Sequence, residues 1–77
     1  MSSETFPAQT TLMTYKVLSK TGYTPIGIAG VYNAIHYGTL VIAEMYIDGN
    51  QAKVRVRNID NGAITTKLHL FVIWQKN

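Results

Sequence analysis

The stretch "QAKVRVRN", Gln51 to Asn58, is the clearest indication of the fold class of this chain. Its cations alternate with valines from Lys53 to Arg57, and a period of two is the pattern of a β-strand with one buried face. The face that carries Lys53, Arg55 and Arg57 is either a surface for an anionic partner or the solvated side of the strand. Charged strand faces are ordinarily solvated, so the three cations remain a candidate anion-binding surface and no more.

The same period of two continues in both directions along the chain. β-Branched and aromatic residues dominate, and no segment has the 3.6-residue stripe of a helix. We expect strands over 11–19, 24–33, 39–47, 51–58 and 64–75, with the second strand bulged or split at Gly27 or Gly30. Turn signals separate them, which predicts an all-β fold: a small antiparallel β-sandwich or short barrel with a hairpin meander. Residues 11–77 form the single β domain, and residues 1–10 are expected to be a flexible lead-in.

The turn after residue 47 supports two registers. Asp48-Gly49 gives a type I′ turn, and Gly49-Asn50 shifts the partners by one diagonal. Either register keeps Glu44 among the cations of the next strand. Either register also predicts one apolar face made of Val41, Ala43, Met45, Val54 and Val56.

The last strand is expected to form a hairpin with residues 51–58 through an Asp60-Asn61-Gly62 loop, with Gly62 in the left-handed conformation. That register pairs Val54 with Leu68 and places Arg55 beside Lys67. The strand has apolar residues on both faces, which a sheet covered on one side does not need. We therefore predict an oligomer interface at Leu70, Phe71, Val72, Ile73 and Trp74.

Composition supports an inter-subunit surface. The chain has 77 residues, of which 47% are hydrophobic and only 14% charged, whereas soluble domains have about 25% charged residues. It has no cysteine, and its histidines, His36 and His69, lie far apart, so no disulfide or metal site is expected. The net charge of +3 favours anionic partners weakly. No apolar run approaches the length of a membrane helix, and "MSSETFPAQTT" lacks the order of a signal peptide.

The sequence shows no catalytic constellation. Its serines are Ser2, Ser3 and Ser19, and Asp48 and Asp60 lie in predicted turns. We expect a non-enzymatic protein without a cofactor. His36 and Tyr37, in the "NAIHYG" loop, are the candidate ligand contacts, with an ordinary turn as the alternative.

Nucleic acid is not the expected partner. Small oligonucleotide-binding barrels usually contain a helix, and the tyrosines here are spread over several strands.

The C-terminal segment "AKVRVRNIDNGAITTKLHLFVIWQKN" resembles the ending of many bacteriophage tail-fibre and receptor-binding proteins, and "GYTPIGIAGVYN" resembles the opening of their terminal domain. The Trp74-Gln75 pair departs from the more usual Leu-Tyr. The matching residues are Val54, Val56, Arg57, Asn58, Ile64, Thr65, Leu68, Leu70, Val72, Ile73, Trp74 and Lys76.

The resemblance implies a β-sandwich head domain, commonly a homotrimer, at the tip of a fibre. It implies a virion protein made in the host cytoplasm that binds host cell-surface carbohydrate. One alternative is a purely architectural trimerisation or capping domain. Another is a small nucleic-acid-binding β-barrel that uses Lys53, Arg55 and Arg57. Because Met1 stands almost at the domain boundary, we also expect a separate small reading frame or a fragment.

Overall fold

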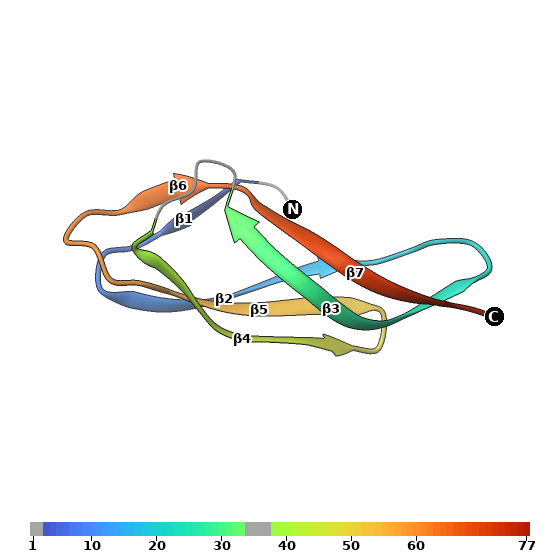
Figure 1. Cartoon of the computed structure of the whole chain (residues 1–77). Helices are drawn as coiled ribbons and strands as arrows, with labels where there is room; N and C mark the ends of the chain where they lie inside the picture. Colours follow the sequence, from blue (N-terminus) through green and yellow to red (C-terminus); the bar gives the residue numbers. More distant parts are fainter. Residues whose placement is uncertain (1–2, 34–37) are drawn as a thin grey trace.

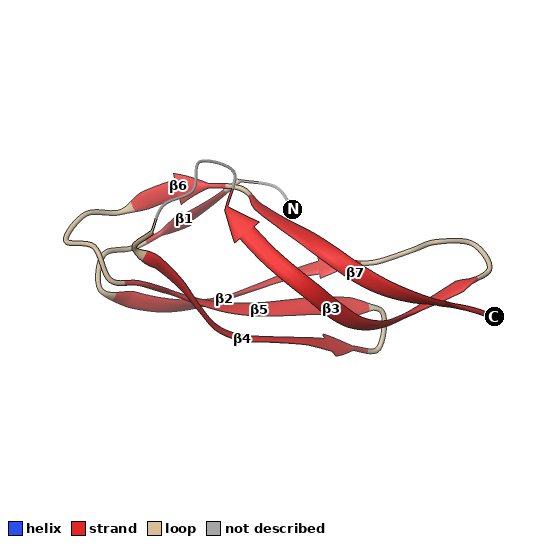
Figure 2. Cartoon of the chain, viewed as in Figure 1, coloured by secondary structure: helices blue, strands red, loops and turns tan. Residues whose placement is uncertain are grey.

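The computed structural model describes residues 3–33 and 38–77, and every regular element in these ranges is a β-strand (Figure 2). The strands are β1 (Glu4–Phe6), β2 (Thr10–Val17), β3 (Tyr23–Asn33), β4 (Leu40–Asp48), β5 (Gln51–Asn58), β6 (Ile64–Thr66) and β7 (Leu68–Lys76). All pairings between them are antiparallel. The prediction of an antiparallel all-β chain is therefore confirmed. Four of the five expected strands are present within a few residues, and the fifth is divided into β6 and β7.

The strands form one three-stranded sheet and two strand pairs. β5 is the central strand of β2-β5-β4, while β3 pairs with β7 and β1 pairs with β6. Figure 1 shows the β3–β7 pair crossing over β2-β5-β4. Among the described strands, β4 and β5 are the only two that are consecutive in sequence and also paired, so the expected hairpin meander is wrong. Most of the pairing joins segments that are distant in sequence.

The core is shared by the three-stranded sheet and both strand pairs. Its buried members are Phe6, Leu40, Val54, Val56, Ile64 and Leu68, and Leu12, Ile28, Val31, Ile42 and Leu70 pack against them. The inward residues of β5 alternate with its exposed arginines, as the period of two predicts. The molecule measures 45 × 19 × 16 Å, and so long and thin a shape leaves few positions out of reach of solvent.

The β4–β5 hairpin uses the second of the two predicted registers. Asp48 pairs with Gln51, so Gly49 and Asn50 form the turn. Gly49 has φ +62° and Asn50 does not have a positive φ, which matches type II′ rather than type I′. Glu44 lies opposite Arg55, as this register requires.

The predicted apolar face of β4 is only partly correct. A register shift between Ile42 and Glu44 leaves Ala43 without a partner on β5. Because of this extra residue, the inward and outward positions of β4 before Ala43 are exchanged relative to those after it. Leu40 and Ile42 therefore face the core, while Val41 lies opposite Arg57 and is exposed.

The last strand does not pair with β5. Both edges of β5 are occupied, by β2 and β4, and the chain breaks at Lys67 into β6 and β7. Val54 therefore pairs with Thr14 and Met45 instead of Leu68. Gly62 does not have a positive φ, so the expected left-handed turn residue is also wrong. The short loop after β5 does not form a hairpin, because the chain passes from the β2-β5-β4 sheet to β6, which pairs with β1.

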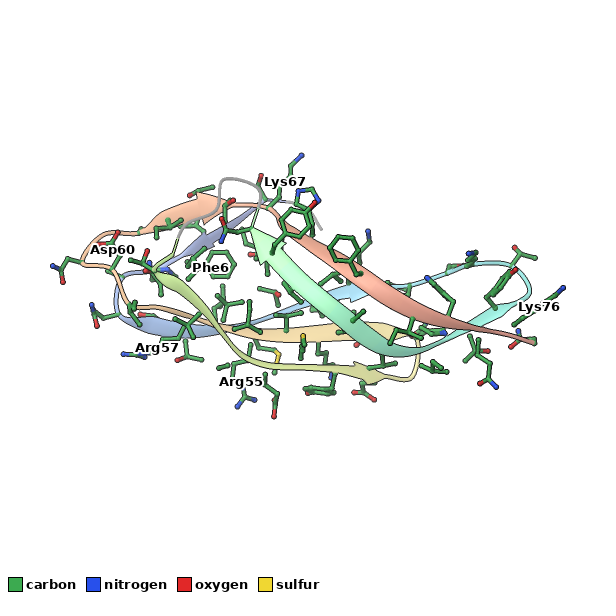
Figure 3. The ribbon with its side chains drawn as sticks, in the orientation of Figure 1. Phe6, Arg55, Arg57, Asp60, Lys67 and Lys76 are labelled. Carbon is green, nitrogen blue, oxygen red and sulfur yellow. The ribbon has the colours of Figure 1, made fainter. Side chains whose placement is uncertain are left out.

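A short strand lies within the predicted lead-in. Glu4–Phe6 forms β1 and pairs with Ile64–Thr66. The Phe6 side chain is completely buried and belongs to the core (Figure 3). The domain boundary predicted at residue 11 therefore excludes a core residue.

Candidate functional site

The three candidate cations lie on the outer face of β2-β5-β4. Lys53 Nζ is 2.8 Å from Asp48 Oδ2, and Arg55 Nη2 is 3.7 Å from Glu44 Oε1. Figure 3 shows Arg55 and Arg57 pointing away from the β3–β7 pair, while Lys67 lies on the opposite side of the molecule. The prediction that Glu44 lies among the cations is confirmed, and the predicted Arg55–Lys67 neighbourhood is wrong.

Each cation has a different environment. The hydrogen bond from Lys53 to Asp48 and the charge of that carboxylate raise the pKa of Lys53, so its ammonium stays protonated in neutral solution. Arg57 donates from Nη1 to Thr11 Oγ1 at 3.2 Å and forms no ion pair with any residue in 3–33 or 38–77. Of the three candidate cations, Arg57 is thus the one without an ion pair to a described carboxylate.

Two tyrosines lie beside Lys53 on this face. Tyr15 of β2 and Tyr46 of β4 are both register partners of Lys53. Directly opposed residues in paired strands project from the same face of a sheet. The sequence suggested scattered tyrosines because the β2–β5 pairing has no local signal. We define the tyrosine–cation face as Met13, Tyr15, Tyr46, Lys53, Arg55 and Arg57.

The predicted oligomer interface on β7 divides between two faces. Leu70, Val72 and Trp74 are half-buried, whereas Phe71 and Ile73 are exposed on the outer face of the β3–β7 pair. Tyr32 and His69 extend that outer face, with ring centroids 4.8 Å apart and an angle of 15° between the rings. The Tyr32 and Phe71 centroids are 5.6 Å apart. We define the outer stripe as Tyr32, His69, Phe71 and Ile73.

Two apolar side chains of the outer stripe lie opposite glycines of β3. Phe71 lies opposite Gly30, and Ile73 lies opposite Gly27. Both apolar side chains lie over these glycines, with Phe71 Cδ2 3.7 Å and Ile73 Cδ1 3.6 Å from where a glycine Cβ atom would stand, and both remain exposed. Register shifts at Pro25/Gly27 and Ile28/Gly30 confirm that β3 is bulged near its glycines, although the strand does not split.

A cavity of about 350 Å³ lies along β7. Its lining combines aliphatic and aromatic side chains with three ionisable residues, Lys16, Tyr32 and His69. Lys16 and Leu18 come from the end of β2 and the chain after it. The full lining is Lys16, Leu18, Tyr32, His69, Leu70, Phe71, Val72 and Trp74.

His36 and Tyr37, the predicted ligand contacts, lie outside the described residues. Within the described part of the chain, no three His, Asp or Glu residues are grouped so that they could hold a metal ion. No helix long and apolar enough to cross a membrane occurs in residues 3–33 or 38–77. The candidate sites built by the described residues are the outer stripe, the tyrosine–cation face and the cavity along β7.

Comparison with known proteins identifies no relative of this chain. No protein-family model matches the chain, and no curated protein or solved structure matches it.

Proposed function

We propose that this chain is a non-enzymatic structural module that self-associates through the outer stripe. One observation carries the proposal: the described residues expose more large hydrophobic side chains than they bury. The described residues include eleven exposed large hydrophobics, against eight buried hydrophobic residues. In the outer stripe, exposed aromatic and aliphatic side chains lie next to one another on the β3–β7 pair.

The size of the outer stripe suits part of a protein interface. Tyr32, Phe71 and Ile73 are 40%, 58% and 46% exposed. Together they present roughly 300 Å² of mostly apolar surface, judged from the area of a whole aromatic side chain. A stable interface buries about 800 Å² per partner, so the outer stripe would supply its apolar centre and neighbouring residues its rim.

The proposed assembly is a homotrimer of small β-sandwich domains at the distal end of a bacteriophage tail fibre. The resemblance of residues 52–77 to tail-fibre endings supports the trimer and the virion location. Binding of a host surface glycan through His36 and Tyr37 is part of the same proposal. The virion location predicts that peptides of this chain occur in purified phage particles.

Light scattering after gel filtration tests the self-association. A trimer of the 8.6 kDa chain has a mass of about 26 kDa. Ile73→Lys places a charge at the proposed interface and should yield monomers. Ile59→Lys is the matched control, because Ile59 is 49% exposed and lies after β5, away from the outer stripe.

A monomeric wild-type chain at micromolar concentration would overturn the self-association. If Ile73→Lys and Ile59→Lys dissociated the assembly equally, the interface would not be specific to the outer stripe. A dimeric mass would support self-association but contradict the trimer.

A further inference from the structure

The tyrosine–cation face combines a row of three cations with exposed aromatic rings. Lys53, Arg55 and Arg57 alternate along β5, so their Cα atoms are spaced by about 6.6–6.8 Å. Tyr15 and Tyr46 lie on either side of Lys53 in the register of the sheet. The face thus places a row of positive charge between two aromatic side chains.

The aromatic members are open to solvent. Tyr15 is 63% exposed and Tyr46 is 38% exposed. Adjacent strands are separated by about 4.8 Å, which puts the two tyrosine Cα atoms roughly 10 Å apart. Because neither ring is needed to fill the core, both are available as surfaces against which a planar ligand can stack.

The charge is distributed unevenly across the sheet. Both acids of this face, Glu44 and Asp48, belong to β4, and β2 contributes none. The positions of β2 opposite Arg57, Arg55 and Lys53 are Thr11, Met13 and Tyr15. An anionic chain that follows β5 on its β2 side therefore meets three cations and no carboxylate from β2.

We propose that the tyrosine–cation face binds single-stranded nucleic acid. The phosphates lie along Lys53, Arg55 and Arg57, and bases stack on Tyr15 and Tyr46. Cations that follow the backbone, together with aromatic rings that accept any base, are the two components of sequence-tolerant single-strand binding. An acidic peptide would use the cations and leave the rings without a planar partner. This inference concerns a different surface from the outer stripe.

The test is the fluorescence anisotropy of a labelled oligothymidylate titrated with the full chain at several salt concentrations. Three neutralised phosphates predict a slope of about −2 for the logarithm of the binding constant against the logarithm of salt concentration. Arg57→Gln should reduce the magnitude of this slope by about 0.7. Lys76→Gln is the charge-matched control, because Lys76 ends β7 and lies outside the face.

Stacking is tested separately from charge. Tyr15→Ala should weaken binding about fivefold or more, where fivefold corresponds to the lower end of the stacking free energy of one base. Tyr15→Phe keeps the ring and should bind like the wild type. Tyr15 is mostly exposed, so neither change removes core packing, and thermal melting checks that both variants fold. Binding should persist in Ile73→Lys, which alters only the outer stripe.

Three results would overturn the proposal. The first is an absence of binding at low salt. The second is equal weakening by Lys76→Gln and Arg57→Gln, which would indicate attraction to the overall charge. The third is unchanged binding by Tyr15→Ala together with equal affinity for heparin, which would identify a surface for any polyanion.

Discussion

Tyr32 stacks on His69 across the β3–β7 pair, with 4.8 Å between the ring centroids and 15° between the ring planes. The two residues are direct register partners, so the contact belongs to the sheet and needs no loop to hold it. Phe71 adds a second ring 5.6 Å from Tyr32. The outer stripe is therefore ordered within a single chain before any second copy covers it.

A double-mutant cycle measures this contact. Tyr32→Ala and His69→Ala should show a coupling free energy of about 0.5–1.5 kcal/mol in urea unfolding at one fixed chain concentration. Tyr32→Ala combined with Tyr46→Ala is the control, because Tyr46 lies on another sheet and should give an additive result. Equal coupling in both cycles would show that the stacking is not a local interaction.

The sequence predicts strand positions better than strand partners, and the reason is physical. Alternation along β5 and β7 reports which face of each strand is buried, and the burial of both strands follows it. Pairing depends on contacts between distant residues, such as Val54 with Thr14, and has no periodic signature. The Ala43 shift likewise has no marker in the sequence, since alanine suits both a regular strand and a bulge.

The candidate site shows the same division. The exposed cations of β5 and the exposed face of β7 follow from alternation alone. The Tyr15–Lys53–Tyr46 row depends on β2 pairing with β5, which the predicted hairpin excluded because it placed the last strand on that edge of β5. Phe6 was missed because three residues are too short a strand to show a period.

Phe6 should contribute a large part of the stability of the domain. Its side chain is fully buried, and Phe→Ala in a core costs about 3–5 kcal/mol. A domain of this length has a free energy of unfolding of only about 4–12 kcal/mol. Chemical denaturation should therefore show severe loss for Phe6→Ala and little for Thr5→Ala, since Thr5 is exposed. Similar effects of the two changes would place β1 outside the core.

The glycines of the two predicted turns should respond differently to alanine. Gly49 has φ +62° and open space where a Cβ atom would lie, so Gly49→Ala should cost about 1–2 kcal/mol through backbone strain alone. Gly62 also has open space but no positive φ, so Gly62→Ala should be neutral or stabilise by up to about 1 kcal/mol. Thermal melting of Gly49→Ala and Gly62→Ala checks this difference. If Gly62 were in the left-handed conformation, both variants would lose similar amounts of stability.

Asn58 fixes the loop that leads the chain from β5 to β6. Its buried side-chain amide donates to the carbonyl oxygens of Phe6 and Gly62, at 2.9 and 3.0 Å, and its Oδ1 accepts from the Asp60 N–H at 2.8 Å. Asn58→Ala leaves these groups without their partner and should cost about 2–4 kcal/mol in urea unfolding. Asn61→Ala is the control, because Asn61 is exposed. A small loss at Asn58 would mean that water replaces the amide.

Lys53 should titrate above an ordinary lysine because of Asp48. The hydrogen bond and charge of that carboxylate raise the Lys53 pKa above 10.5, so the pair adds stability below that pH and loses it as the pH rises through the folded-state pKa. Asp48→Asn should return the pKa toward 10.5, measured from the NMR shift of the Lys53 side-chain carbon next to nitrogen. Glu44→Gln should leave it unchanged, because Glu44 pairs with Arg55. A Lys53 pKa that is insensitive to Asp48→Asn would contradict the ion pair that orders this end of the tyrosine–cation face.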